Sequence, residues 1–202
     1  MRWVALGDSY TIGTSVAEAD RWPNQLVATL AGKTPPIAVE LVANLAVNGY
    51  TSGDVIEREL PQLDALDPEL VSLLIGVNDV VRRVPPGRYR ANVQTILDDL
   101  VGRVGAARIL ALTTPDYTVT AAGADYGDPA AQAAAIREHN RILAEEAAAR
   151  SVLVVDIHDL SLRAADDRRL VARDGLHPSG AQYALWVERI APRVTAMLET
   201  PR

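Results

Sequence analysis

Short apolar runs alternate with longer amphipathic segments along this chain. Five of the runs are rich in Val, Ile or Leu and show little polar alternation, which is typical of strands covered on both faces. The predicted strands are Trp3–Leu6, Ala38–Val42, Leu70–Ile75, Arg108–Leu112 and Val152–Asp156. Because longer helical patterns separate these runs, the sequence predicts an α/β fold in which crossover helices join parallel strands.

Helix signals occupy the segments between the predicted strands. Pro23 is expected to begin a helix that reaches about Ala31, because proline is tolerated at the first helical position. Ser52 is expected to cap another that reaches Leu60. The remaining predicted helices are 88–104, 130–150 and 178–198. In the first of these three, apolar residues recur three and four positions apart and predict one stripe that packs on the sheet: Val93, Ile96, Leu97, Leu100, Val101 and Val104.

We find no internal repeat, low-complexity linker or break in composition, and therefore expect a single domain over residues 1–202. Two longer stretches, 113–128 and 157–173, are expected to be irregular. Both follow predicted strands, and an open parallel sheet binds ligands outside the carboxyl ends of its strands. These two loops are therefore candidate walls of a binding cleft.

Composition narrows the possible partners and compartments. A net charge of −6 and a pI near 5.1 argue against a nucleic-acid partner. The pairs Arg82-Arg83 and Arg168-Arg169 are interpreted as solvated surface. The absence of cysteine excludes disulfides, thiolate metal sites and a cysteine nucleophile. We expect no signal peptide, because the first predicted strand begins almost at Met1. No apolar run approaches the roughly 18 residues of a membrane-spanning helix. We expect a soluble, cytoplasmic protein, unless a leader has been trimmed.

Two motifs at opposite ends of the chain contain the parts needed for nucleophilic acyl transfer. Gly7-Asp8-Ser9-Tyr10 offers a hydroxyl, and Asp174-Gly175-Leu176-His177-Pro178 offers a base with a carboxylate. Asp174 precedes His177 by three residues and can therefore orient the imidazole within one loop. Ser9 taken alone also fits a helix cap or a turn. A site requires a fold that brings the two ends of the chain together.

Two further positions near predicted strand ends could stabilise an oxyanion. Gly49, in Asn48-Gly49-Tyr50, could bring its backbone N–H close to a substrate, although Asn-Gly is also an ordinary turn dipeptide. Asn78, in Gly76-Val77-Asn78-Asp79, offers an amide donor without a titrating proton. A helix cap is the other interpretation of Asn78.

The three histidines differ in their suitability as a catalytic base. His139 lies at helical spacing between apolar residues, which favours packing at the boundary of the core. His158 follows the last predicted strand and is the one rival of His177. His158 lacks the carboxylate three residues earlier that would fix its tautomer, so we favour His177.

Together, the four sequence blocks around Ser9, Gly49, Asn78 and His177 resemble those of SGNH hydrolases, also called GDSL esterases/lipases. The blocks occur in the family's order and span nearly the whole chain. The resemblance implies a flavodoxin-like three-layer α/β/α domain with a parallel sheet of about five strands. It also implies hydrolysis of small-molecule carboxylic esters or thioesters without a metal or other cofactor.

The resemblance assigns roles to individual positions. Ser9 corresponds to the nucleophile, and Asp174 and His177 complete the triad. The N–H groups of Ser9 and Gly49 and the side chain of Asn78 correspond to the oxyanion hole. The chain has Tyr10 where the family's nickname has Leu.

Two other functions remain open. A metal-dependent phosphoesterase could use Asp8, Asn78 and His177 as ligands, although such sites generally contain several histidines. A non-catalytic relative could bind an acyl group or a glycan in the same pocket. No Gly-x-Ser-x-Gly elbow, Walker-type loop or dinucleotide fingerprint is present. The acyl length, the leaving group and the oligomeric state stay open. Candidate lining residues are Tyr10, Trp22, Tyr50, Tyr117 and Tyr126.

Overall fold

A five-stranded parallel sheet lies at the centre of the computed structural model, which describes residues 1–199. The strand order is β2-β1-β3-β4-β5, and every neighbouring pair is parallel. This arrangement confirms the predicted fold class. The strands are β1 (Arg2–Gly7), β2 (Glu40–Asn44), β3 (Leu70–Leu74), β4 (Ile109–Leu112) and β5 (Leu153–Val155).

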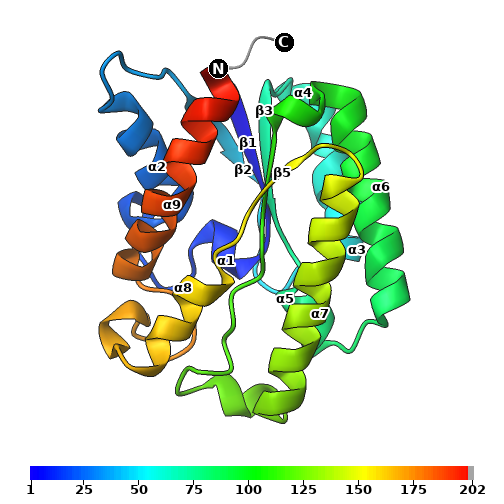
Figure 1. Cartoon of the computed structure of the whole chain (residues 1–202), viewed down its shortest axis with the longest axis vertical. Coiled ribbons are helices and arrows are strands. Elements are labelled where there is room, and N and C mark those ends of the chain that lie inside the picture. Colours follow the sequence, from blue (N-terminus) through cyan, green and yellow to red (C-terminus); the bar gives the residue numbers. More distant parts are fainter. Residues whose placement is uncertain (200–202) are drawn as a thin grey trace.

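Helices cover both faces of the sheet, which gives three layers (Figure 1). The long helices α2 and α9 pack together on one face, and α6 and α7 pack together on the other. The helices are α1 (Ser9–Ile12), α2 (Trp22–Ala31), α3 (Ser52–Asp54), α4 (Leu63–Leu66), α5 (Val77–Val81), α6 (Pro86–Val104), α7 (Pro129–Ala148), α8 (His158–Leu162) and α9 (Gly180–Glu199).

Each face of the sheet has its own hydrophobic core. On the α2/α9 side, Trp3 packs against Trp22 in a tilted arrangement with ring centroids 5.6 Å apart, and Trp186 belongs to the same core and is fully buried. On the other side, the predicted stripe of α6 is buried against the sheet, and each such side chain contributes about 1.5–3 kcal/mol. Its fully buried members are Val93, Ile96, Leu97 and Leu100. These two apolar layers fix the sheet between the helices.

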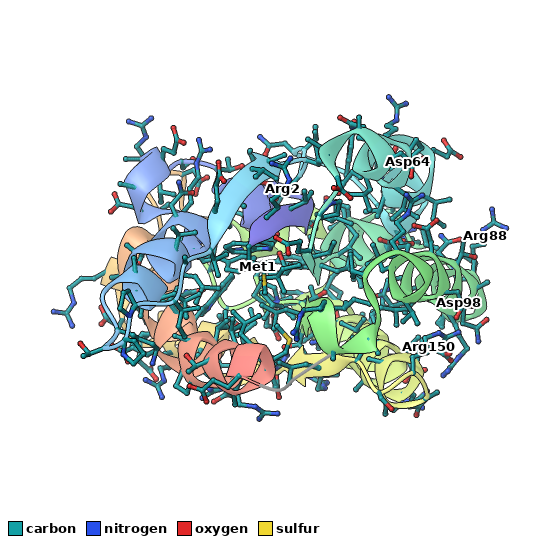
Figure 2. All side chains as sticks on the ribbon, turned by 90° about the horizontal axis from the view of Figure 1, so that it is seen from above. Met1, Arg2, Asp64, Arg88, Asp98 and Arg150 are labelled. Atoms are coloured by element: carbon teal, nitrogen blue, oxygen red, sulfur yellow. The ribbon has the colours of Figure 1, made fainter. Side chains whose placement is uncertain are left out.

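The view along the strands shows charged groups at the outer surface of the helical layers (Figure 2). Arg150 pairs with Asp98 of α6 at 2.6 Å, and Arg90 pairs with Glu145 and Glu146 of α7. Because exposed ion pairs contribute only about 0–1 kcal/mol each, the buried apolar faces hold α6 and α7 in place. Among residues 1–199, no helix is long and apolar enough to cross a membrane.

The helix predicted to begin at Ser52 differs from the prediction in its cap and in its course. Thr51 is the N-cap, because its hydroxyl accepts from Asp54 N at 3.3 Å and the Asp54 carboxylate accepts from Thr51 N at 2.9 Å. Ser52 instead donates its hydroxyl and its N–H to Asp79. After one turn the segment continues as a π-helix over Val55–Glu59 and a 3₁₀ turn over Leu60–Gln62.

The prediction that residues 157–173 are irregular was wrong. This segment contains α8 and two 3₁₀ turns, Arg163–Ala165 and Arg168–Leu170. The loop 113–128 is irregular until a 3₁₀ turn at Gly123–Tyr126. Helices of five residues or fewer, such as α8, are too short to produce a recognisable hydrophobic period, which is why the pattern did not indicate them.

The strand order creates a crevice at the carboxyl ends of β1 and β3. The chain turns toward opposite faces of the sheet after these two neighbouring strands, so the loops that follow them separate. Close packing of β1 against β3 at this point requires glycine at position 7. A Cβ added to Gly7 would lie 2.3 Å from the Leu74 carbonyl oxygen, and the φ of +147° is one that other residues rarely adopt. Ser9 follows Gly7 by two positions and begins α1.

Candidate active site

Ser9 is held at the start of α1, immediately above the end of β1. Asp8 caps this helix, and its carboxylate accepts a hydrogen bond from Tyr10 N at 3.0 Å. As the first helical residue, Ser9 has a backbone N–H without a partner inside the helix. Ser9 is only 7% exposed and lines a pocket of about 210 Å³. Ser9 therefore brings both a hydroxyl and a free backbone N–H to the edge of this pocket.

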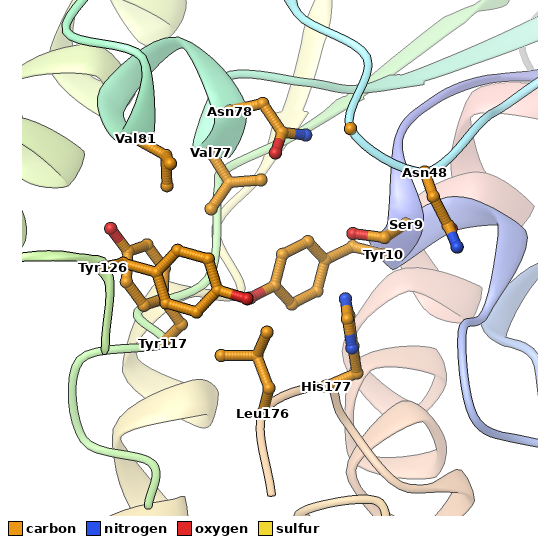
Figure 3. A pocket seen from close by; sticks show the side chains of 11 residues that line it. Ser9, Tyr10, Asn48, Val77, Asn78, Val81, Tyr117, Tyr126, Leu176 and His177 are labelled. Atoms are coloured by element: carbon orange, nitrogen blue, oxygen red, sulfur yellow. The ribbon is translucent and has the colours of Figure 1, made fainter. Parts of the chain in front are cut away.

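His177 and Asp174 form a hydrogen-bonded pair on the loop before α9. The Nδ1 atom of His177 lies 2.7 Å from Oδ2 of Asp174. The other carboxylate oxygen, Oδ1, accepts from the backbone N–H groups of Leu176 and His177 at 2.9 and 3.0 Å. These bonds orient the carboxylate, which in turn orients the imidazole. His177 lines the same pocket as Ser9, and in Figure 3 one ring nitrogen points toward the Ser9 side chain.

The environment of Asp174 favours its ionised form. Partial burial alone would raise the pKa of this carboxyl, but hydrogen bonds from the Ser15 hydroxyl and from Leu176 and His177 outweigh burial. The pKa of Asp174 therefore lies below its ordinary value. A carboxylate that stays ionised at neutral pH can stabilise a protonated imidazole beside it.

Gly49 lies in a turn that borders the pocket. Tyr50 N donates to the Val47 carbonyl at 3.1 Å, and Gly49 has a φ of +83°, as the third residue of a type II turn requires. The N–H of Gly49 belongs to the central peptide of the turn and takes no part in the bond that closes it. Gly49 and its neighbour Asn48 both line the pocket.

Asn78 lies on α5, across the pocket from His177 (Figure 3). Its Nδ2 donates to the Tyr50 carbonyl at 2.9 Å and lies 3.5 Å from Oδ2 of Asp8. Because Gly76 caps α5, the helix-cap interpretation of Asn78 was wrong. The bond to Tyr50 ties the amide of Asn78 to the turn that contains Gly49.

Arg82 supports the Gly49 turn from outside the pocket. Its Nη2 donates to the Gly49 carbonyl at 2.7 Å, while 58% of its side chain is exposed. The interpretation of Arg82 as solvated surface therefore missed a structural contact, and nothing in the local sequence pointed to it. Arg169, 88% exposed and paired with Asp167, does fit the surface interpretation.

Beyond Ser9 and His177 the pocket is largely apolar. Tyr117 and Tyr126 meet edge to face with ring centroids 5.6 Å apart, and the Tyr117 hydroxyl donates to Gln132 at 2.6 Å. Among residues 1–199, no Asp, Glu, Lys or Arg lines this pocket. Trp22 is buried in the core, and Tyr50 lies outside the lining, so these two lining predictions were wrong. The apolar part of the lining consists of Tyr10, Val77, Val81, Tyr117, Tyr126 and Leu176.

The other two histidines have different surroundings from His177. His139 is 2% exposed and stacks on Tyr89 with ring centroids 4.1 Å apart. Burial lowers the pKa of His139, which favours its neutral form. Nε2 of His158 lies 3.7 Å from Asp116. In the described part of the chain, the lining of the pocket includes His177 but neither His139 nor His158.

Two buried carboxyl groups, Asp8 and Glu59, lie close to Ser9 in the fold. From the sequence, Asp8 was considered only as a possible metal ligand, and Glu59 was not singled out. Burial, with a smaller contribution from Asp79, raises the pKa of Asp8 to about 8. Glu59 accepts from Gly7 N at 2.9 Å, and burial raises its pKa to about 9. Across residues 1–199, no three His, Cys, Asp or Glu side chains are grouped so that they could hold a metal ion.

The family of this chain is shown by comparison with known proteins. The model of the GDSL-like lipase/acylhydrolase family matches residues 5–185, and the chain therefore belongs to this family. An arylesterase from Vibrio mimicus is 32% identical over 95 residues, which is 46% of this chain and 46% of that protein. The matched part therefore spans about half of the length of this relative.

Solved structures share the fold. The structure of TesA has a TM-score of 0.74 at 19% identity, and the match covers 98% of this chain and 99% of that one. A variant of Axe2, an acetyl xylan esterase from Geobacillus stearothermophilus, has a TM-score of 0.76 at 19% identity, with 100% of this chain and 96% of that chain covered. At this identity the likeness concerns the fold alone.

Proposed function

We propose that this protein hydrolyses carboxylic esters through a serine nucleophile and an acyl-enzyme intermediate. The observation that carries the proposal is the imidazole of His177, which Asp174 orients through a 2.7 Å hydrogen bond beside the pocket that Ser9 also lines. Membership of the GDSL-like lipase/acylhydrolase family supports the same reaction class. Thioesters remain possible substrates, because the same attack applies to a thioester carbonyl.

In the first step, the Ser9 hydroxyl attacks the ester carbonyl while Nε2 of His177 accepts the hydroxyl proton. The imidazolium then donates this proton to the leaving alkoxide as the acyl–oxygen bond breaks. In the second step, His177 takes a proton from water, the hydroxide attacks the acyl-enzyme, and the proton returns to Ser9. Asp174 stays ionised and stabilises the charged imidazole during both steps.

Three donors are proposed to stabilise the oxyanion of each tetrahedral intermediate. They are the N–H groups of Ser9 and Gly49 and the side-chain amide of Asn78. The free N–H at the start of α1, the unused N–H in the centre of the Gly49 turn and the amide of Asn78 support this assignment. Besides its bond to Tyr50, the Asn78 amide makes only a long contact, 3.5 Å, with Asp8, and an oxyanion would displace it. All three residues line the pocket.

The pocket supports an uncharged acyl group of modest size. Its volume is about 210 Å³, and its far end is closed by Tyr117, Tyr126 and Val81 (Figure 3). Within the described residues 1–199, neither Lys nor Arg lines the pocket to balance the charge of an anionic acyl chain. We propose that the acyl group extends from Ser9 toward this aromatic end.

The decisive variant is Ser9→Ala. The wild-type protein is expected to hydrolyse p-nitrophenyl acetate and to be labelled by a fluorophosphonate, because His177 activates the Ser9 hydroxyl. The variant should lose labelling and nearly all turnover, while circular dichroism shows the same fold. Activity should persist in EDTA.

Other outcomes would support the alternatives. Turnover that disappears in EDTA and survives Ser9→Ala would indicate the metal-dependent phosphoesterase. A wild-type protein that is neither labelled nor active, yet binds esters, would indicate a binding relative.

A further inference from the structure

Ser15 makes a hydrogen bond that the proposed reaction does not yet explain. Its hydroxyl donates to Oδ2 of Asp174 at 2.7 Å, across 159 positions of the chain. The same oxygen accepts from Nδ1 of His177 at 2.7 Å. Ser15 therefore contacts the one carboxylate atom that holds the imidazole, whereas the backbone donors Leu176 and His177 contact only Oδ1.

The backbone of Ser15 is held in a conformation that serine rarely adopts. Its φ is +67°, in the left-handed region that favours glycine. An unfavourable conformation persists where the surrounding structure enforces it, and such positions concentrate at functional sites. Here the conformation turns the hydroxyl of Ser15 toward the loop that contains Asp174.

The residue before Ser15 makes a complementary contact on the other side. The Thr14 hydroxyl donates to Oδ1 of Asn48 at 2.6 Å, beside Gly49. Two consecutive hydroxyl groups thus connect the loop after α1 to two different segments, the turn that contains Gly49 and the loop that contains Asp174 and His177. Both loops line the pocket that contains Ser9.

We propose that Ser15 is a positioning residue that acts through Asp174, fixing the carboxylate so that His177 faces Ser9. This inference rests on the proposed esterase function. Asp174 and His177 are connected within one loop, but Ser15 connects that loop to the segment that follows the nucleophile. A hydrogen bond to a charged acceptor loses most of its strength when its geometry loosens, so the position of Oδ2 governs how often the imidazole is correctly placed.

The test separates the hydroxyl from the backbone conformation. Ser15→Gly removes the hydroxyl and relaxes the positive φ, whereas Ser15→Ala removes the hydroxyl and keeps the strain. We expect both variants to lower kcat for p-nitrophenyl acetate roughly tenfold with KM changed less than about twofold. If the backbone alone mattered, Ser15→Gly would retain wild-type kcat, and the proposal would be wrong.

Ser151→Gly is the matched control. Ser151 also has a positive φ, +58°, and lies exposed between α7 and β5, outside the pocket lining. We expect Ser151→Gly to leave kcat unchanged. The unfolding midpoint of Ser151→Gly measures how much relief of a positive φ changes stability at a position outside the pocket. A similar loss of kcat in Ser151→Gly would show that the Ser15 effect is not specific and would overturn the proposal.

A double-mutant cycle tests whether Ser15 acts through Asp174. The rate of fluorophosphonate labelling is measured for wild type, Ser15→Gly, Asp174→Asn and the double variant. With Asp174 present, we expect Ser15→Gly to lower the labelling rate roughly tenfold. When Asp174 is replaced by Asn, we expect Ser15→Gly to have little effect on this rate. If Ser15→Gly slowed labelling by the same factor in the wild-type and Asp174→Asn backgrounds, the proposal would be contradicted. Ser9→Ala in the same panel distinguishes failure of the esterase function, because labelling that persists there would refute the nucleophile itself.

Discussion

The side chain of Asn78 is anchored by a hydrogen bond and also lines the pocket. An amide has two N–H donors, and one of them is used by the Tyr50 carbonyl at 2.9 Å. That bond keeps the amide beside the pocket, and the proposed oxyanion would accept its second hydrogen. Asp8 lies 3.5 Å from the same nitrogen, a distance too long for a strong competing bond.

Asn78→Ala should therefore lower kcat by roughly 10²–10³ if the amide stabilises the oxyanion. KM for p-nitrophenyl acetate should change little, because the charge that Asn78 stabilises develops only in the transition state. Steady-state kinetics of purified wild type and variant provide the measurement. Asn24→Ala, on α2 and outside the pocket lining, is the control and should keep wild-type kinetics. A kcat for Asn78→Ala close to that of the wild type would remove Asn78 from the proposed oxyanion hole.

The segment between β4 and α7 determines the far wall of the pocket. Tyr117 comes from its irregular part and Tyr126 from the 3₁₀ turn Gly123–Tyr126. Gln132, on the first turn of α7, accepts from the Tyr117 hydroxyl at 2.6 Å and donates to the Tyr126 carbonyl at 3.1 Å. One helical side chain therefore holds both aromatic residues in place.

Tyr126→Ala should open the far end of the pocket to longer acyl groups. Tyr126 is 41% exposed, so its removal connects the pocket to solvent without emptying the core. Each additional methylene that becomes buried contributes about 0.8 kcal/mol, which is roughly a fourfold gain in kcat/KM. The ratio of kcat/KM for p-nitrophenyl hexanoate to that for the acetate should rise in the variant. Leu162→Ala, an exposed apolar position of α8, should leave the ratio unchanged. An unchanged ratio in Tyr126→Ala would contradict the proposed direction of the acyl chain.

The fold also buries carboxyl groups that affect its stability as a whole. Asp8 and Glu59 have pKa values raised by burial to about 8 and about 9, far above those of an unfolded chain. Between the unfolded and folded pKa values, the native state binds more protons than the unfolded state. Stability from these groups is complete below the unfolded pKa and is lost as pH rises through the folded pKa.

The free energy of unfolding should therefore fall between pH 6 and pH 9. Each of the two groups contributes a slope of up to about 1.4 kcal/mol per pH unit. Carboxyls with lowered pKa values, such as Asp54 and Asp174, are already ionised in both states in this range and add no slope. Urea unfolding at pH 6, 7, 8 and 9 measures the trend.

Glu59→Gln is the matched variant for this prediction. A glutamine oxygen can accept from Gly7 N as Glu59 does, but the side chain cannot ionise. The slope, rather than the absolute stability, is the quantity to compare, because the amide adds buried donors. We expect a shallower slope in the variant. Equal slopes in variant and wild type would show that Glu59 does not titrate in the folded protein.

Features that depend on neighbours in the chain were predictable. The five strands follow from short continuous apolar runs, and the long helices follow from apolar periodicity. Helix α6, for example, spans Pro86–Val104 where residues 88–104 were predicted. The hydrogen bond between Asp174 and His177 was also expected, because three residues of one loop bring the two side chains within reach. The secondary-structure elements and the Asp174–His177 bond both depend on residues that are close together in the chain. The sequence alone was therefore enough to predict them.

Other features depended on how distant segments pack. The bond from Ser15 to Asp174, the anchoring of Gly49 by Arg82 and the burial of Glu59 behind Gly7 join residues 159, 33 and 52 positions apart. No periodicity or motif signals such contacts, because serine, arginine and glutamate are common on surfaces. They arise only when the parallel order of β2, β1 and β3 and the packing of α9 against α2 bring these loops to one edge of the sheet.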